Sequence, residues 1–453
     1  MYSFQEPQPP KSWDNTRLCI NHGPRGPQKG LFLERFGPYI ETNEDCLYLN
    51  VFAPQWEFQL NSRPVMVFIH GGGFAVHSSA NYGDLNILIV VTIQYRLGLL
   101  GFCATGDENC VTNLGLRDQA MALKWVKDNI SYFNGDPDNI TLFGQSAGAA
   151  SVDMLCLSPY TRELFNKAVL LGGSASCAWA IADINDVRES AMNIDNGQIN
   201  ESMMNFLKKQ PSKRLAMSLT GSKRSEKNPY GMYFVPVIDG DFLPAPIEVL
   251  RKNVPKKLCI VGTTEYEGLF FAIKENNPKS RPSLCQSKCT LKIPLSHTLL
   301  RHQYVFQLLS DICINNGVHK FAKNMTLAEH TVYLYSFTYS SPQTFGFLSF
   351  LFPFTAATHT LELPFLFDKG IISNFKPSDD DRKVINKFTA LITNFAIKGD
   401  PNGTEDLWKP LTQADTYRYL EINLNCSMNS NYENRRSEFW HKIKMRKNMH
   451  TNI

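Results

Sequence analysis

Asn139-Ile-Thr-Leu-Phe-Gly-Gln-Ser-Ala-Gly148 is the segment from which the architecture follows, because it joins a strand-like run to a helix-like run through the pattern Gly-x-Ser-x-Gly. The apolar residues before Gly144 predict a buried strand, and residues 147–157, rich in Ala, Met and Leu, predict a helix. A serine at so sharp a turn has a strained backbone, and flanking glycines remove side chains that would collide with strand and helix. The segment therefore predicts an exposed Ser146 hydroxyl beside the unpaired amides of a helix start.

The flanking sequence predicts an α/β fold. Residues 65–69 and 87–93 are almost entirely apolar and predict central strands, and residues 113–130 carry apolar side chains at helical spacing. Strand character returns at 257–261 and 332–337. Such alternation is typical of a mostly parallel sheet with crossover helices.

The chain as a whole, residues 1–453, is expected to form one domain, because no linker is long enough to divide it. Residues 180–225 are polar, Lys-rich and without strand character, so we expect a helical insertion there. A hydrophobic content of 43% over 453 residues allows a large core.

Composition argues against several partners. The net charge of +4 is small for this length, and the basic residues gather only near the end, at Arg435-Arg436 and 441–447, which we interpret as a solvated helix end. The longest apolar stretches, 85–93 and 344–357, are shorter than the roughly 20 residues of a membrane span. We therefore expect no nucleic-acid partner and no membrane span.

The sequence features that indicate the cellular compartment disagree with one another. Residues 1–10 have neither the charged start nor the apolar core of a secretory signal. Eleven cysteines nevertheless exceed the usual content of a cytosolic enzyme, and an odd number leaves at least one unpaired or paired between chains. Asn324-Met-Thr326 and Asn402-Gly-Thr404 are glycosylation acceptor patterns that fit a secreted protein.

The pattern His70-Gly-Gly-Gly-Phe74 follows the strand predicted at 65–69. Three successive glycines let backbone amides approach a substrate oxygen, as the second half of an oxyanion hole requires; otherwise they form only a flexible turn. The other donor is expected to be the amide of Ala147, which follows the serine.

Candidates for the acid and the base that would act with Ser146 lie further along the chain. Glu267 comes just after the strand predicted at 257–261, with Glu265 as the alternative, and either could instead be a surface charge. His359 lies between an aromatic run and an apolar segment, where it could be a catalytic base or a buried histidine with ordinary hydrogen bonds. Other histidines lie in polar or amphipathic segments: His302, His319, His330, His441 and His450.

With these features, the chain resembles the cholinesterase/carboxylesterase (type B) family of α/β-hydrolases over about residues 8–440. The ordered motifs that carry the resemblance are Glu44–Val51, His70–Phe74, Tyr95–Gly98, Asn113–Gln119, Asn139–Gly148, Pro236–Gly240, Glu267-Gly268, His359–Glu362 and Asn394–Asn402. The resemblance implies Ser146 as nucleophile, Glu267 as acid and His359 as base. It also implies Gly72, Gly73 and Ala147 as oxyanion donors, with no metal or organic cofactor.

The resemblance further implies a disulfide between Cys19 and Cys46, and an extracellular or secretory-pathway location. A late bridge of the cholinesterase branch is expected to be absent, because Ser437 and Glu438 stand at its position; Cys285 and Cys289 could pair locally. The family begins with a signal peptide and antiparallel strands before the segment seen here, so the chain is expected to be truncated at its N-terminus.

Three departures bear on the substrate. The segment 74–89 is shorter than in the family, with His77 where glycine is common. Phe36 falls near the position of the aromatic residue that grips quaternary ammonium, and neutral Gln145 stands where cholinesterases resemble one another in having glutamate. We therefore expect a carboxylesterase acting on small esters with apolar groups and without choline preference. The alternative is an inactive, neuroligin-like adhesion protein on the same fold, and a second is an unstable truncated product.

Overall fold

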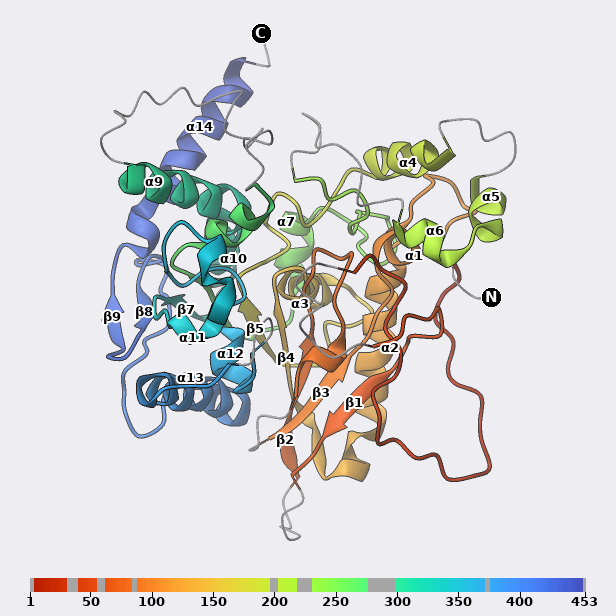
Figure 1. Ribbon diagram of the computed structural model, residues 1–453, viewed down its shortest axis with the longest axis horizontal. Coiled ribbons are helices and arrows are strands. Elements are labelled where there is room, and N and C mark those ends of the chain that lie inside the picture. Colours follow the sequence, from red (N-terminus) through yellow and green to blue (C-terminus); the bar gives the residue numbers. More distant parts are fainter. Residues whose placement is uncertain are drawn as a thin grey trace. The chain divides into compact units, whose positions relative to one another are not determined.

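The computed structural model describes residues 4–30, 40–54, 62–83, 88–195, 203–217, 230–275, 298–370 and 375–450. The described residues fall into two compact units, which span Met1–Lys167 with Trp179–Pro255 and Ala168–Ala178 with Lys256–Ile453. In each unit, mostly parallel strands carry packed helices (Figure 1), so the predicted α/β class is confirmed. The single domain remains a prediction.

The strands of the first unit lie in the order β1-β3-β2-β4. Their bounds are Leu49–Phe52 for β1, Ile89–Ile93 for β3, Arg63–Ile69 for β2 and Gly135–Gln145 for β4. β1 is antiparallel to β3, whereas β2 runs parallel to both of its neighbours. Every residue of β3 is buried, as is β2 from Val65 onward, which is the burial that their apolar runs predict.

The helices of the first unit are α1 (Gly98–Phe102), α2 (Leu114–Asn129), α3 (Ala147–Leu157), α4 (Ile184–Met192), α5 (Met203–Lys209), α6 (Ser212–Met217) and α7 (Ile247–Leu250). α2 and α3 pack against β4, and Figure 1 shows α2 alongside the strands. The helices α4 to α6 occupy the described part of the predicted insertion, whose residues 196–202 and 218–225 lie outside the described residues.

The strands of the second unit lie in the order β5-β6-β7-β8-β9. Their bounds are Lys167–Leu171, Leu258–Thr264, Thr331–Phe337, Tyr419–Ile422 and Ser427–Asn429. β6, β7 and β8 are parallel, and β9 is antiparallel to β8. Because parallel strands end at the same edge, the residues that follow β6 and β7 are brought to one rim.

The helices of the second unit are α9 (Thr298–Ser310), α10 (Asn316–Leu327), α11 (Pro342–Phe345), α12 (Leu363–Phe367), α13 (Asp379–Lys398) and α14 (Arg436–His450). Ser378 and Asp381 form a capping box at the start of α13, and Gly399, at φ 77°, ends it. The ring of Phe388 on α13 packs on Tyr335 and Phe337 of β7, with centroid distances of 6.0 and 5.5 Å.

The basic segment near the end of the chain forms α14, as expected, but Arg436 is not a solvated charge. Its Nε donates to Asp311 over 2.7 Å, and its guanidinium also pairs with Glu433. No helix among the residues that the structure describes is long and apolar enough to cross a bilayer.

Candidate functional site

Ser146 lies at the sharp turn between β4 and α3 that its sequence predicts. Its backbone angles are φ 57° and ψ −121°, in a region that residues other than glycine rarely adopt. Ala147 is the first residue of α3, and the helix has the predicted bounds, Ala147–Leu157. The serine is partly exposed although its neighbours Gln145 and Ala147 are buried.

The two glycines of the Gly-x-Ser-x-Gly pattern are required by close backbone approach. A Cβ on Gly144 would lie 2.5 Å from the carbonyl of Gly148, and one on Gly148 would lie 2.0 Å from the carbonyl oxygen of Ile69. Neither contact is possible without moving a strand. The two glycines are therefore required by the close packing of the turn, which on the side of Gly148 is against β2.

The glycine loop that follows β2 approaches the same turn. Ile69 of β2 pairs with Gly144 of β4, so both strands end at one edge. A Cβ on Gly71 would lie 3.0 Å from the Cβ of Ser146, while Gly72 and Gly73 have φ values of 98° and 62°. The structure thus brings the predicted oxyanion loop next to the predicted nucleophile.

His70, at the start of this loop, is a structural histidine. It is fully buried, its Nδ1 lies 2.9 Å from the carbonyl oxygen of Gly71, and its ring stacks on Tyr95 at 4.5 Å. Burial lowers the pKa of His70 to about 3, so the ring is neutral at physiological pH. The ring is therefore packed inside the fold at the start of the loop.

The second unit contains an acid–histidine pair. Nδ1 of His359 lies 2.5 Å from Oε2 of Glu267, and both side chains are buried. Oε1 of Glu267 accepts a hydrogen bond of 2.8 Å from the backbone amide of Thr264, at the end of β6. The contact to His359 therefore comes from Glu267 and not from Glu265, the alternative that the sequence left open.

Backbone and hydroxyl bonds hold the two loops of this pair together. The amide of Tyr266 donates to the carbonyl of Ala357 over 2.9 Å, and Thr358 Oγ1 donates to the carbonyl of Tyr266 over 2.7 Å. The rings of Phe270 and Phe271 lie 5.9 and 5.4 Å from the imidazole. His359 thus has a fixed ring orientation and an apolar wall, as its sequence context suggests.

Sequence reasoning did not identify Gly172, which lies just after β5. A Cβ at this position would be 3.1 Å from Oε1 of Glu267 and 3.3 Å from Nδ1 of His359, and its φ is 58°. Its amide donates to the carbonyl of Gly262 over 2.9 Å. The sequence feature that could have identified Gly172 is the pair Gly172-Gly173, which comes directly after an apolar strand.

Sequence reasoning also missed the burial of Glu362. Only 1% of this residue is exposed, and neither of its carboxylate oxygens has a hydrogen-bond partner among the described residues. Burial and the nearby charge of Glu267 raise the pKa of Glu362 well above its usual value. The hydroxyl of Tyr335, which interacts electrostatically with Glu362 and Glu267, is also buried and has no hydrogen-bond partner within the described part of the chain. Burial and the charge of Glu267 both favour the protonated form of Glu362.

Glu362→Gln is expected to reduce the loss of stability between about pH 5 and pH 8. In the parent chain the folded state keeps this proton after the unfolded state has lost it, so the free energy of unfolding falls as the pH rises above about 4.5. An amide has no such proton, so the Tm of the variant rises relative to the parent on going from pH 5 to pH 8, by roughly 1 °C for each kcal/mol recovered in a chain of this length. Thermal melts at both pH values measure this, with Glu163→Gln as the exposed control. A constant gap between variant and parent would mean that Glu362 is ionised in the fold.

His77, at one of the predicted departures from the family, has φ 86°, which explains why glycine suits this position. The side-chain amide of Gln28 holds its backbone, accepting from the His77 amide over 2.8 Å and donating to the His77 carbonyl over 2.9 Å. Three other predicted features lie outside the described residues: Phe36, Cys285 and Cys289.

Cys19 and Cys46 are separate thiols in the structure, so the disulfide implied by the resemblance is not formed there. Cys19 is exposed, whereas Cys46 is buried, and burial raises its pKa to about 12. The bridge stays a prediction. The described residues contain no group of three or more His, Cys, Asp or Glu side chains that could hold a metal ion.

Known proteins match this sequence over both units. A sequence model of the carboxylesterase family matches residues 2–300 and 296–440. Esterase cest-33 of Caenorhabditis elegans is 36% identical over 485 residues, covering 97% of this chain and 87% of the relative. Carboxylesterase 5A of Mus musculus is 31% identical over 489 residues, covering 96% of this chain and 81% of the relative. Bile salt-activated lipase of Rattus norvegicus is 32% identical over 451 residues, covering 87% and 72% respectively.

These matches include the turn at Ser146, the loop after β2 and the pair of His359 with Glu267. They also agree with the mostly parallel sheet flanked by helices, which is the arrangement of an α/β-hydrolase. With its sequence motifs and its fold in agreement, the chain belongs to the carboxylesterase family.

Proposed function

We propose that the chain hydrolyses carboxylic esters through an acyl-enzyme on Ser146, with His359 as base and Glu267 as the acid that orients it. The observation that carries the proposal is the buried 2.5 Å bond between Nδ1 of His359 and Glu267. It commits Nδ1 as a donor, so Nε2 is the nitrogen that would accept the serine proton. Family membership and relatives named esterase, carboxylesterase and lipase support the same reaction.

In the proposed first step, His359 removes the proton of Ser146 and the oxygen attacks the ester carbonyl. The amides of Gly72, Gly73 and Ala147 would stabilise the negative charge that develops on the carbonyl oxygen, and His359 then protonates the departing alcohol. Water, activated by the same histidine, releases the acid. The position of Ala147 at the start of α3 supports its role, because amides at a helix start lack intrahelical partners.

Esters with apolar groups are the proposed substrates. The rings of Phe270 and Phe271 beside His359 offer an apolar surface. Neutral Gln145, next to the nucleophile, supplies no negative charge for a quaternary ammonium group. We therefore propose a small-molecule carboxylic ester without a cationic choline group.

The inactive adhesion protein is the less favoured alternative. Its discriminating feature is an incomplete triad, whereas this chain carries serine, glutamate and histidine in the family's order. The close relatives are also named as esterases and lipases.

We propose a secretory or extracellular location, with the Cys19–Cys46 bridge formed by oxidation after folding. Between the acceptor patterns at Asn324 and Asn402, Asn402 is the less suited, because its Nδ2 donates to Asp400 Oδ1 and to the Trp408 carbonyl, each over 2.9 Å. Asn324 lies within α10 and is partly exposed. A glycan is therefore proposed at Asn324 rather than Asn402, and intact mass before and after glycosidase treatment checks it.

Covalent labelling by a fluorophosphonate tests the proposed nucleophile. We expect one adduct per chain, mapped by mass spectrometry to the peptide of Ser146, because only an activated serine reacts rapidly with this probe. Ser190→Ala, on the partly exposed face of α4, should be labelled like the parent. An adduct on another serine, or no adduct on folded protein, would overturn the assignment.

A further inference from the structure

Two cysteines lie in the loop that joins α1 to α2. Cys103 follows α1 directly, and its amide donates to the carbonyl of Leu99 over 3.1 Å. Cys110 Sγ lies 3.6 Å from the carbonyl oxygen of Cys103, and only 2% of Cys103 and 7% of Cys110 are exposed. A hydrogen bond between the two thiols raises the pKa of Cys103 and contributes most to lowering that of Cys110. The Cys110 thiol therefore lies against the backbone of Cys103, and the two side chains are close enough to interact.

The loop between the cysteines is held in its turn by its own contacts. Gly106 has φ 74°, Thr105 Oγ1 donates to Asp107 Oδ1 over 2.8 Å, and the amide of Asn109 donates to the same oxygen over 3.0 Å. These bonds bring the chain back on itself within eight residues, 103–110. The cysteines are thus held close before any bond forms between them, which lowers the entropy cost of joining them.

We propose that Cys103 and Cys110 are a redox site that forms an intrachain disulfide. The oxidant is a low-molecular-weight disulfide, R–S–S–R. The Cys110 thiolate attacks one of its sulfurs and releases R–S⁻; the Cys103 thiolate then attacks the Cys110 sulfur and releases the second R–S⁻. The two cysteines lose two electrons and two protons, and the oxidant is reduced to two R–SH. Cys110 is the attacking residue because it is the more exposed of the two.

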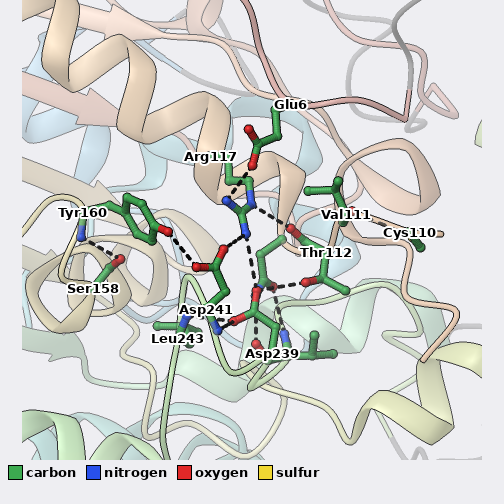
Figure 2. A network of polar contacts seen from close by, with 12 residues as sticks. Glu6, Cys110, Val111, Thr112, Arg117, Ser158, Tyr160, Asp239, Asp241 and Leu243 are labelled. Carbon is green, nitrogen blue, oxygen red and sulfur yellow. Dashed lines mark hydrogen bonds and ion pairs between the residues drawn. The ribbon is translucent and has the colours of Figure 1, made fainter. Parts of the chain in front are cut away.

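The bond would fix the entrance to α2, which a polar network already holds (Figure 2). Directly after Cys110, Thr112 Oγ1 donates to Asp239 Oδ2 over 2.9 Å, and Asn113 Nδ2 donates to the same oxygen over 2.7 Å. Arg117, one turn into α2, pairs with Glu6 and Asp241 over 2.9 and 2.5 Å. A bond between residues 103 and 110 would therefore restrain the chain immediately before this network.

Oxidation of the full chain by oxidised glutathione tests the proposal. After alkylation of the remaining thiols, non-reducing peptide mapping should yield a linked pair of peptides that contain Cys103 and Cys110. Closing a loop of about this size is expected to raise Tm by about 2–5 °C over the reduced protein. The melts are run in a Cys19→Ser background, in which the proposed Cys19–Cys46 bridge cannot form. There Cys103→Ser and Cys110→Ser should abolish this rise, whereas Cys426→Ser, which removes a partly exposed cysteine elsewhere, should keep it.

Mapping of the parent chain decides the proposal even if a serine variant fails to fold. Full alkylation of both thiols after oxidation, a stable glutathione adduct on Cys110 without the internal bond, or a link from either residue to another cysteine would each overturn it. In Cys103→Ser, by contrast, the glutathione adduct on Cys110 is the expected product, because the resolving thiol has been removed.

Discussion

Ser146→Ala is expected to lower kcat for a p-nitrophenyl ester roughly 10,000-fold or more, with little change in KM. The reason is that no other group can form the acyl-enzyme, so only the oxyanion loop and substrate binding still favour the reaction. The measurement is steady-state hydrolysis with highly purified variant, since a trace of parent enzyme would mask a loss of this size.

The same substitution should leave the fold intact. Ser146 has φ 57°, and alanine has a comparable backbone cost there, so circular dichroism and a cooperative melt should match the parent. Ser190→Ala serves as the matched control and should keep full activity. If folded Ser146→Ala protein hydrolysed the ester at the parent rate, Ser146 would not be the nucleophile.

The nucleophile turn was predictable because its requirements are local. The helix begins and ends at the predicted residues, Ala147 and Leu157, and both flanking glycines are required by backbone contacts within the same turn. The strand before it starts at Gly135 rather than at Asn139, because Gly135 pairs with Arg63 across a shift in register with β2. The intervening polar residues, 136–139, gave no strand signal.

The acid–histidine pair was less predictable, because its members are 92 residues apart and the choice depends on tertiary contacts. Glu265 and Glu267 have similar sequence surroundings, and what separates them is the bond from the Thr264 amide that fixes the Glu267 carboxylate. The polar or amphipathic context of His330 likewise does not reveal that it is buried and accepts from the Lys257 amide over 3.0 Å. Whether a histidine is structural or catalytic is decided by partners that spacing along the chain does not specify.

Burial of a polar side chain is similarly outside the reach of local patterns. The motif His359-Thr-Leu-Glu362 contributes to the family resemblance, but it does not show that the glutamate is buried without a partner beside Glu267. That property depends on tertiary packing, which also places the Tyr335 hydroxyl of β7 within electrostatic reach of both carboxylates. The raised pKa of Glu362 therefore follows from packing rather than from the motif.

Glu267→Gln is expected to lower kcat by about 10,000-fold while leaving KM nearly unchanged. In the parent, Oε1 accepts from the Thr264 amide and Oε2 accepts from Nδ1 of His359. Glutamine has one oxygen and one NH₂ group, so it cannot accept both bonds. If its NH₂ group faces the imidazole, the ring must carry its proton on Nε2 and can no longer act as a base; if it faces the Thr264 amide, two donors meet in a buried site.

Glu265→Gln is the matched control, because it makes the same chemical change two residues away and should alter kcat by less than about threefold. Melting curves of both variants separate a loss of catalysis from a loss of folding, and fluorophosphonate labelling of Ser146 should slow in parallel with kcat in Glu267→Gln only. Equal losses in the two variants, or full activity of Glu267→Gln, would contradict the assignment of Glu267 as the acid. The expected pattern, a large effect at 267 and almost none at 265, depends on the single carboxylate that bonds the imidazole of His359.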